Sequence, residues 1–526
     1  MIAVLRSSSL CALLALPLAL LAQNSLPKPK AQHVVLCVWD GMRPDFITPE
    51  HTPTLHAFAQ RGTFFANNHS FYVTTTEVNG TVLATGAFPQ RSGILANREY
   101  RPAINLMKAV STEAAHTIRV GDALADGKYV DALTVAEIVQ KAGHRTAVAG
   151  TKPIALLHDR GFDRTDTHGS VVLFAGKTYP EAFLKAISSP LGKFPPYPDT
   201  AVSLEESEPN TAQNSWTTRA FTEVLWKDEV PKYSVLWLGD PDFSQHLTAP
   251  GHPTALAAIR DCDTHFAAVL AALEAKGVTD STNVFVVSDH GFSTVAKAVD
   301  LVATFRKAGL AATKEFKMTP KPDEVLIVNV GGSTSVYVIG KSTATIQKIV
   351  DLLQGSEFAG PIFTREGLPG TFTLADGYMG AEHAPDVVFS FRTLPGLNKY
   401  GAPGLIYGEG KRPGFGTHGT LGESDIRNTL VAAGPDIRAG FRNELPTGNI
   451  DVVPTMLHLL GLAAPVPSDG RVLTEALAGT NPPAGKPITT RMEATRSLGA
   501  MTWRQSIQTT TFGERTYFDH GTATVE

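Results

Sequence analysis

Carboxylate and imidazole side chains follow apolar segments at three separate places in this chain. Asp40 ends HVVLCVWD, Asp242 ends SVLWLGDPD, and Asp289 and His290 close NVFVVSDH. Each apolar run predicts a buried parallel strand, and open α/β sheets bind their ligands at the carboxyl ends of such strands. Three carboxylates gathered there would repel one another unless a cation lay among them. These residues therefore predict a metal-dependent enzyme.

Further imidazoles extend this candidate metal site. Asp242 and His246 are four residues apart, which places both side chains on one face if the segment is helical. His418 lies in GFGTHGT, whose glycines allow a close approach of the backbone. Oxygen and imidazole ligands without thiolate suit a catalytic Zn or Mn site better than a structural zinc cage. The other histidines are expected to be ordinary capping or hydrogen-bonded groups, including His252, His383 and His458.

A hydroxyl group at the start of a short predicted helix is the candidate nucleophile. In TTTEVNGTVLATG the helix is expected to begin at Thr76 and to end at Gly86. A hydroxyl there faces unpaired backbone N–H groups and the positive end of the helix dipole, a setting that favours phosphate or sulfate. A threonine hydroxyl becomes a good nucleophile once a metal or a base lowers its pKa. Thr74, Thr75 and Thr76 are also helix N-cap candidates, so the segment alone leaves both roles open.

Composition limits the partners of the protein. The chain has 526 residues, 43% hydrophobic and 18% charged, which allows one large domain with insertions or two domains. Its formal net charge is −4, and this argues against a nucleic-acid polymer held by bulk electrostatics. A nucleic-acid polymer is therefore not an expected partner.

The N-terminus carries an export signal. One arginine precedes an apolar stretch from Leu10 to Leu21, and cleavage is expected near Ala22. The stretch is shorter than the ~20 residues of a membrane span. Residues 1–22 are therefore predicted to be a signal peptide, and the mature protein to be secreted or periplasmic without membrane attachment.

Strand-like and helix-like segments alternate along the chain, which is typical of a layered α/β domain. We expect a catalytic domain over residues 30–480, interrupted by a smaller α+β cap at roughly 300–410 that contains a hairpin around Gly331 and Gly332. A Pro/Gly-rich linker at 479–487 precedes an antiparallel pair of strands within 488–526, packed on the core. Cys37 and Cys262 are expected to be buried core residues and not a disulfide.

Five motifs occur in an order that resembles a known family. They are VWDGMRPDF, T-x-x-N-x-x-x-x-x-T-G-x-x-P-x-x-x-G-I from Thr76 to Ile94, DPDFSQH, VSDHG and GTHG. Together they resemble the alkaline phosphatase superfamily, in its type I phosphodiesterase/nucleotide pyrophosphatase branch, over residues 32–470. The resemblance implies a three-layer α/β/α core with a mostly parallel sheet and a hydrolase of phosphoric esters.

The resemblance also implies roles for individual residues. One metal would be bound by Asp242, His246 and His418, and the other by Asp40, Asp289 and His290, with Thr76 on this second metal. The ions would be two Zn²⁺, with Mn²⁺ as an alternative, about 4 Å apart. Asn97 would contact a phosphoryl oxygen, and Lys152 partly matches a lysine that binds the extra negative charge of monoesters and phosphonates. Thr76 would form a phospho-threonine that water then hydrolyses.

Two positions depart from the pattern of the family. Glu77-Val78 stands where Phe-Pro is usual, and Ser92 stands where His precedes Gly-Ile. Both lie beside the expected substrate, so the preferred leaving group stays open. The alternatives to a phosphodiesterase are a phosphomonoesterase, an enzyme like phosphonoacetate hydrolase, and a metal-binding protein without catalysis.

Overall fold

The computed structural model describes residues 26–160, 169–198, 207–481 and 483–526. The predicted signal peptide lies outside these residues. Across the described ranges, no helix combines the length and the apolar character that a bilayer crossing requires.

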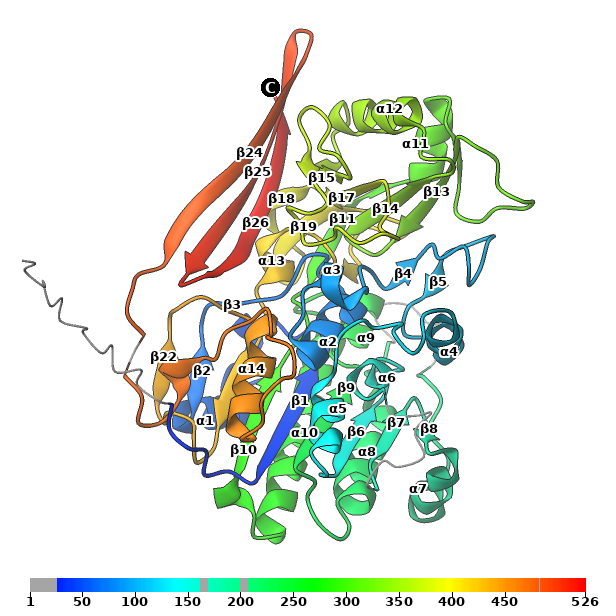
Figure 1. The fold of residues 1–526 in the computed structure, drawn as a ribbon. Coiled ribbons are helices and arrows are strands. Elements are labelled where there is room, and N and C mark those ends of the chain that lie inside the picture. Colours follow the sequence, from blue (N-terminus) through cyan, green and yellow to red (C-terminus); the bar gives the residue numbers. More distant parts are fainter. Residues whose placement is uncertain (1–25, 161–168, 199–206, 482) are drawn as a thin grey trace, which may run out of the picture.

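A nine-stranded sheet forms the centre of the molecule (Figure 1), with the order β22-β2-β21-β10-β1-β9-β6-β7-β8. The five strands from β10 to β7 run parallel, and the pairs β10–β21, β2–β21 and β7–β8 are antiparallel. The bounds are β1 His33–Trp39, β2 Thr63–Phe65, β6 Thr146–Gly150, β7 Val171–Phe174, β8 Lys177–Tyr179, β9 Tyr233–Leu238, β10 Thr282–Val287, β21 Leu430–Ala433 and β22 Phe441–Asn443. The mostly parallel sheet confirms the predicted fold class.

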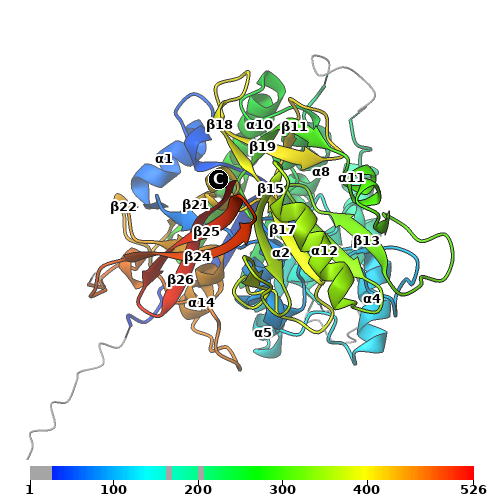
Figure 2. The same cartoon turned by 90° about the horizontal axis from the view of Figure 1, so that it is seen from above.

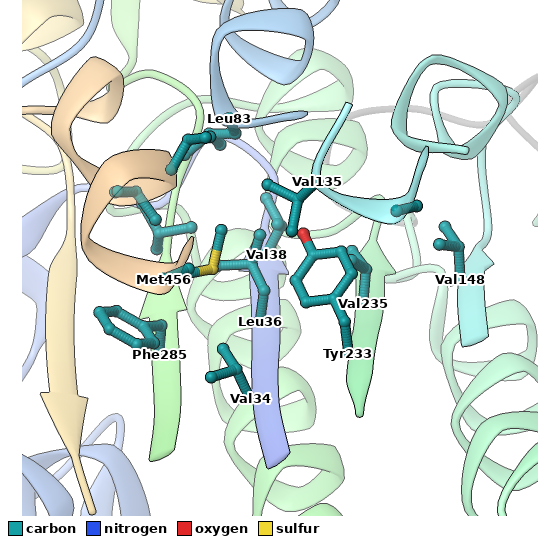
Figure 3. Packing of buried hydrophobic residues seen from close by; sticks show 14 of the residues in the cluster. Val34, Leu36, Val38, Leu83, Val135, Val148, Tyr233, Val235, Phe285 and Met456 are labelled. Carbon is teal, nitrogen blue, oxygen red and sulfur yellow. The ribbon is translucent and has the colours of Figure 1, made fainter. Parts of the chain in front are cut away.

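Helices bury both faces of this sheet, which explains the continuous apolar runs in its central strands. In β1, Val34, Leu36 and Val38 point to one helical layer (Figure 3), whereas Val35 and Cys37 point to the other. Cys37 and Cys262 are buried free thiols, as expected.

The first helical layer contains α2 Thr76–Thr85, α5 Val135–Lys141, α6 Ala155–His158 and α14 Asn449–Leu459. The second contains α1 Pro53–Arg61, α8 Thr211–Arg219 and α10 Pro253–Ala275. Shorter or peripheral helices are α3 Pro89–Ser92, α4 Ala115–Leu124, α7 Leu184–Leu191, α9 Asp242–Leu247 and α13 Glu423–Ile426.

Helix α14 begins at Asn449, and Asp451 lies in its first turn. The Asp451 carboxylate accepts the backbone N–H of Gly448 at 2.9 Å, which caps the start of the helix.

The cap lies at one end of the central sheet, above α2 and α9 in Figure 1. It contains a six-stranded sheet in the order β12-β13-β14-β17-β15-β16 and a four-stranded sheet in the order β18-β19-β11-β20. Strands β13 and β14 form the hairpin at Gly331 and Gly332. The strands are β11 Ser293–Val299, β12 Ala311–Thr313, β13 Glu324–Asn329, β14 Ser333–Val338, β15 Ala359–Thr364, β16 Phe372–Thr373, β17 Val387–Phe391, β18 Thr393–Leu397, β19 Pro403–Glu409 and β20 Gly416–Thr417, and the helices are α11 Leu301–Lys307 and α12 Thr343–Gln354.

The C-terminal residues form three antiparallel strands and not a pair. They are β24 Ile488–Leu498, β25 Met501–Phe512 and β26 Arg515–Val525. The third strand arises because Ile488–Leu498 pairs with β25 along its whole length. Strands β25 and β26 contact β15, so this sheet packs beside the cap, as the view from above shows (Figure 2).

Candidate active site

Three carboxylates lie together because of the strand order of the central sheet. Strand β1 pairs with both β9 and β10, so the residues that follow these three strands meet at one edge. Asp40 directly follows β1, and Asp289 follows β10 after one serine. Asp242 begins α9 just after β9, and the helical turn places His246 Nε2 3.3 Å from Asp242 Oδ1. The sequence therefore predicted the gathering of these groups from local signals.

The ligand atoms form two overlapping groups, each within 4.8 Å. One group contains Asp40, Asp289 and His290, which is the set expected for one metal. The other contains Asp242, His290 and His418. His290 thus lies at the junction of both groups, and its ring stacks on that of His418 with centroids 3.6 Å apart. The sharing of His290 was not foreseen, because spacing along the chain carries no information about it.

Backbone carbonyls orient the three imidazoles. In each ring the Nδ1 atom lies within hydrogen-bonding distance of a carbonyl oxygen, so we assign the proton to Nδ1. These contacts join His290 to Gly291 (2.9 Å), His418 to Thr74 (2.9 Å) and His246 to Gly416 (3.2 Å). Each Nε2 atom then faces the carboxylates, and once it is free of a proton its lone pair has the orientation of a metal ligand.

Each carboxylate has one oxygen that is held by donors. Asp40 Oδ2 accepts from Trp237 Nε1 at 3.0 Å and from Lys152 Nζ at 2.8 Å. Asp289 Oδ1 accepts the backbone N–H groups of Gly41 at 2.9 Å and of His290 at 3.0 Å. Asp242 Oδ2 lies 3.5 Å from Lys152 Nζ. These contacts fix the orientation of the second oxygen in each group.

The second oxygens are Asp40 Oδ1, Asp242 Oδ1 and Asp289 Oδ2. They are buried and accept no hydrogen bond from any described residue, and we call them the open oxygens. They lie 3.7, 3.3 and 3.1 Å from imidazole Nε2 atoms. A carboxylate oxygen that faces an imidazole lone pair is destabilised unless a cation or a proton lies between them. The donor set and its geometry therefore fit divalent metal ions.

The pKa values report the same electrostatic conflict. Burial raises the pKa of Asp40 well above its usual value, and the Asp242 and Asp289 carboxylates raise it further. Burial opposes ionisation of Asp242 too, but Lys152, His246 and His418 together outweigh burial and hold the pKa of Asp242 well below its usual range. Burial lowers the pKa of His290, yet the surrounding carboxylates, Asp289 foremost, together outweigh burial and raise that pKa to about 9. Metal binding must therefore displace a proton from His290.

Thr76 lies beside the first ligand group. It is the first residue of α2, as the sequence predicted, and its Oγ1 atom is 3.3 Å from His290 Nε2. The side chain is buried, and the N-terminus of α2 places backbone N–H groups and a positive partial charge next to it. The hydroxyl can therefore face both a metal-bound phosphate and the helix dipole.

Asn97 is held next to Thr76 by a backbone contact. Its Oδ1 atom accepts the N–H of Glu77 at 3.1 Å, so its Nδ2 group is left as the donor. Glu99 fixes the loop that carries Asn97 by accepting the N–H of Leu95 at 2.7 Å. Burial opposes ionisation of Glu99, but Arg101, His383 and the Leu95 N–H together outweigh burial and lower the pKa of Glu99 to about 2. Asn97 can therefore donate a hydrogen bond toward a group on Thr76.

Lys152 reaches the cluster and is not an ordinary surface lysine. Its ammonium group contacts Asp40 and Asp242, and it also interacts with the charges of Glu113 and Glu77. Sequence reasoning missed Trp237 because it lies inside an apolar run, and it missed Glu113 because no motif surrounds it. Glu77 could have been found from the sequence, because it departs from the family motif at the position after Thr76.

The three histidines expected to be ordinary groups lie elsewhere. His252 caps α10 by accepting the N–H of Thr254 at 3.1 Å, and His383 Nε2 is 3.0 Å from the carbonyl oxygen of Gly93. His458 lies in the last turn of α14.

Comparison with known proteins identifies the family. The fold is that of the alkaline phosphatase superfamily. The sequence profile of the type I phosphodiesterase/nucleotide pyrophosphatase family matches residues 34–394. The chain belongs to this family, whose members hydrolyse phosphoric ester bonds.

Individual relatives are distant but extend over much of the chain. Rat ectonucleotide pyrophosphatase/phosphodiesterase family member 7 is 22% identical over 84% of this chain and 85% of its own length. The human member 7 is 23% identical, and that alignment covers 50% of this chain and 52% of the human protein. The structure of murine ectonucleotide pyrophosphatase/phosphodiesterase 5, an inactive form in complex with AMP, has a TM-score of 0.59 and 18% identity, covering 85% of this chain and 100% of that one.

Because the open oxygens are destabilised without a cation, we predict that metal binding stabilises the fold. Zinc at 1,000 times its Kd should raise the free energy of unfolding of the chelator-treated protein by about 4 kcal/mol for each ion bound. Asp289→Asn keeps the acceptor for the N–H groups of Gly41 and His290 but removes one open oxygen. This variant should therefore bind one ion fewer, and zinc should raise its free energy of unfolding by much less. Thermal unfolding with and without zinc, together with elemental analysis, measures both effects.

Asp263→Asn is the matched control. Asp263 is a buried carboxylate on α10 that accepts the N–H groups of Thr54 and Leu55. This variant should keep the full response to zinc. If zinc stabilised Asp289→Asn as much as the unmodified protein, Asp289 would not be a metal ligand.

Proposed function

We propose that this protein is a secreted or periplasmic phosphodiesterase or nucleotide pyrophosphatase that uses Thr76 as its nucleophile. The observation that carries the proposal is the position of the Thr76 hydroxyl, 3.3 Å from an imidazole that also faces two open oxygens. A metal-dependent nucleophile needs this juxtaposition.

Seven side chains would hold two zinc ions, with manganese as an alternative. One ion would bind Asp242, His246 and His418, and the other Asp40, Asp289, His290 and Thr76. When bound, the ions would neutralise phosphoryl charge and lower the pKa of the attacking groups. Because His290 Nδ1 faces a carbonyl oxygen, His290 would offer one Nε2 lone pair and so would bind a single ion, although it belongs to both groups of candidate ligands.

The side chains of the protein carry out the nucleophilic attack and stabilise the phosphoryl group. The Thr76 oxygen attacks phosphorus as its proton passes to solvent, and the P–O bond to the leaving group breaks with its electron pair on the leaving-group oxygen, which takes up a proton from water. Asn97 Nδ2 donates a hydrogen bond to a phosphoryl oxygen, and the N-terminus of α2 stabilises the developing charge. Water then attacks the phospho-threonine, which releases phosphate or a monoester and restores Thr76. Positioning and charge neutralisation supply most of the rate in this chemistry.

The relatives support the substrate class. They include a Xenopus laevis protein named bis(5'-adenosyl)-triphosphatase, and an inactive murine relative with a threonine-to-alanine change that holds AMP. A small-molecule phosphate ester is therefore the proposed substrate here too, and a nucleic-acid polymer is not. The apolar N-terminal stretch from Leu10 to Leu21 supports export.

Thr76→Ala tests the nucleophile. This variant should fold and bind zinc like the unmodified protein, because the carboxylates and imidazoles remain. Its turnover of bis(4-nitrophenyl) phosphate should fall by about 1,000-fold or more. Thr75→Ala, which changes the N-cap residue of the same helix, is the control and should stay within about 10-fold.

Activity of the Thr76 variant close to that of the control would exclude Thr76 as the nucleophile. Full zinc binding by the unmodified protein without turnover of any phosphate ester would favour the non-catalytic alternative.

Lys152→Met tests whether Lys152 binds substrate. We propose that its ammonium group contacts the additional negative charge of a phosphomonoester, since it lies at the cluster with 21% of its side chain exposed. The variant should lower kcat/KM for 4-nitrophenyl phosphate by about 10- to 1,000-fold, and for methyl 4-nitrophenyl phosphate much less. Equal losses for both esters would mean that Lys152 acts only by orienting Asp40 and Asp242.

A further inference from the structure

The C-terminal sheet ends in a long and exposed edge strand. Its order is β24-β25-β26, so β24 forms one edge and β26 the other. Strand β26 contacts β15 and α13, whereas β24 packs mainly on β25 and lies on the outside of this sheet (Figure 1). Every one of the 11 residues of β24 is exposed or half-buried. An edge strand of this kind presents unpaired backbone groups that can pair with a further strand.

The hydrogen bonds within the sheet show which residues of β24 have their backbone groups at the free edge. Thr502 of β25 exchanges backbone hydrogen bonds with Glu526, at 2.7 and 3.0 Å. Partners alternate along an antiparallel strand, so the residue before it, Met501, bonds to β24 instead. Met501 lies opposite Leu498. The even-numbered residues of β24 therefore bond to β25, and the N–H and C=O groups of the odd-numbered residues within 489–497 point to the free edge.

Strand β24 lacks the features that commonly prevent edge pairing. Folded proteins protect edge strands with proline, lysine or a β-bulge. The segment ITTRMEATRSL contains neither proline nor lysine, and its register with β25 is unbroken from Ile488 to Leu498. Its outer face carries two opposite charges, Arg491 and Glu493, whose side chains are 58% and 46% exposed. The strand is therefore open to pairing along its length.

The two charges select one way in which two copies of β24 can pair. In a symmetric antiparallel pair with Met492 at the two-fold axis, Arg491 lies opposite the partner's Glu493, and symmetry repeats this ion pair. An axis at Arg491 or at Glu493 would instead place like charges opposite each other, which is destabilising. An axis at Ala494 would leave both charges opposite neutral residues. Charge complementarity thus favours the register centred on Met492.

The same register matches the backbone and the exposed apolar side chain of the strand. Arg491 and Glu493 are odd-numbered, so their N–H and C=O groups already point to the free edge and would bond to the partner strand. Ile488 is 62% exposed, and it would lie diagonally across from the partner's Leu498 on the other face. Backbone pairing, charge and apolar burial therefore agree on one arrangement.

We propose that β24 is a self-association surface, through which two copies of this chain form a symmetric antiparallel dimer with Met492 at the two-fold axis. The occupant is a second copy because the segment complements its own charges and its own unpaired backbone groups. The two C-terminal sheets would join into one continuous sheet. This inference is independent of the metal site and of the proposed function, and neither of its tests depends on catalysis.

Cysteine cross-linking of the full chain tests the register. Opposite residues at a position that is not hydrogen-bonded have Cα atoms about 4.5 Å apart, within the range of a disulfide. Met492→Cys should therefore give a disulfide-linked dimer with a mild oxidant, seen on a non-reducing gel. Ala494→Cys is the matched control on the same face, because its two copies would be about 13 Å apart along the strands and should not cross-link. Cys37 and Cys262 are buried and should not compete.

Charge reversal tests the dimer in solution. Sedimentation velocity over a concentration series should show a reversible equilibrium between monomer and dimer. Arg491→Glu places like charges opposite each other at both symmetric positions and should raise the Kd of the dimer by about 10-fold or more. The double variant Arg491→Glu, Glu493→Arg restores complementarity and should regain the original Kd. Lys317→Glu is the control, since it makes the same change of charge at an exposed residue between β12 and β13.

A chain that stays monomeric over the whole series would overturn the proposal. A dimer whose Kd is the same in Arg491→Glu would also overturn it, because another surface would then hold the two copies together. Equal cross-linking of the two cysteine variants would contradict the register centred on Met492. Thermal unfolding shows which variants are folded, and the charge variants decide the outcome if Met492→Cys does not fold.

Discussion

The structure depends on one electrostatic constraint. Three buried carboxylate oxygens lie close to imidazole Nε2 atoms, and a cation or a proton is needed between them. The open oxygens of Asp40, Asp242 and Asp289 lie 3.1–3.7 Å from Nε2 atoms, and their other oxygens are already held by donors. Burial of such groups costs several kcal/mol per charge unless a counter-charge is present. Divalent cations bound by these groups would supply that counter-charge, with the carboxylate oxygens and imidazole nitrogens as ligands.

The fold supplies the rigidity that holds these charges in place. Strand β1 lies between β9 and β10, and helices bury both faces of the sheet, so the strand ends cannot move apart without opening the core. Trp237 shows the coupling directly, because its indole ring packs in the core while its Nε1–H holds Asp40 at 3.0 Å. The candidate nucleophile Thr76 is tied to the same frame, since Thr74, two residues before it, orients the ring of His418 through its carbonyl oxygen.

Much of the site could be predicted from sequence because its signals are local. An apolar run that ends in Asp40 or Asp289 indicates a strand end, and the spacing from Asp242 to His246 indicates a helical turn, which α9 provides. The position of His290 between both ligand groups, the bond from Trp237, and the approach of Glu113 depend on contacts between distant segments. The same limit explains the third C-terminal strand, because strand pairing is decided by partners and not by the residues of one segment.

The most direct test of the central claim is an anomalous difference map, recorded at the zinc absorption edge from crystals of the protein grown with zinc. The account predicts two peaks per chain, about 4 Å apart. One should touch Asp40 Oδ1 and Asp289 Oδ2, and the other Asp242 Oδ1, with His290 beside at least one of them. A fully active crystal form without a peak at the open oxygens would contradict the account.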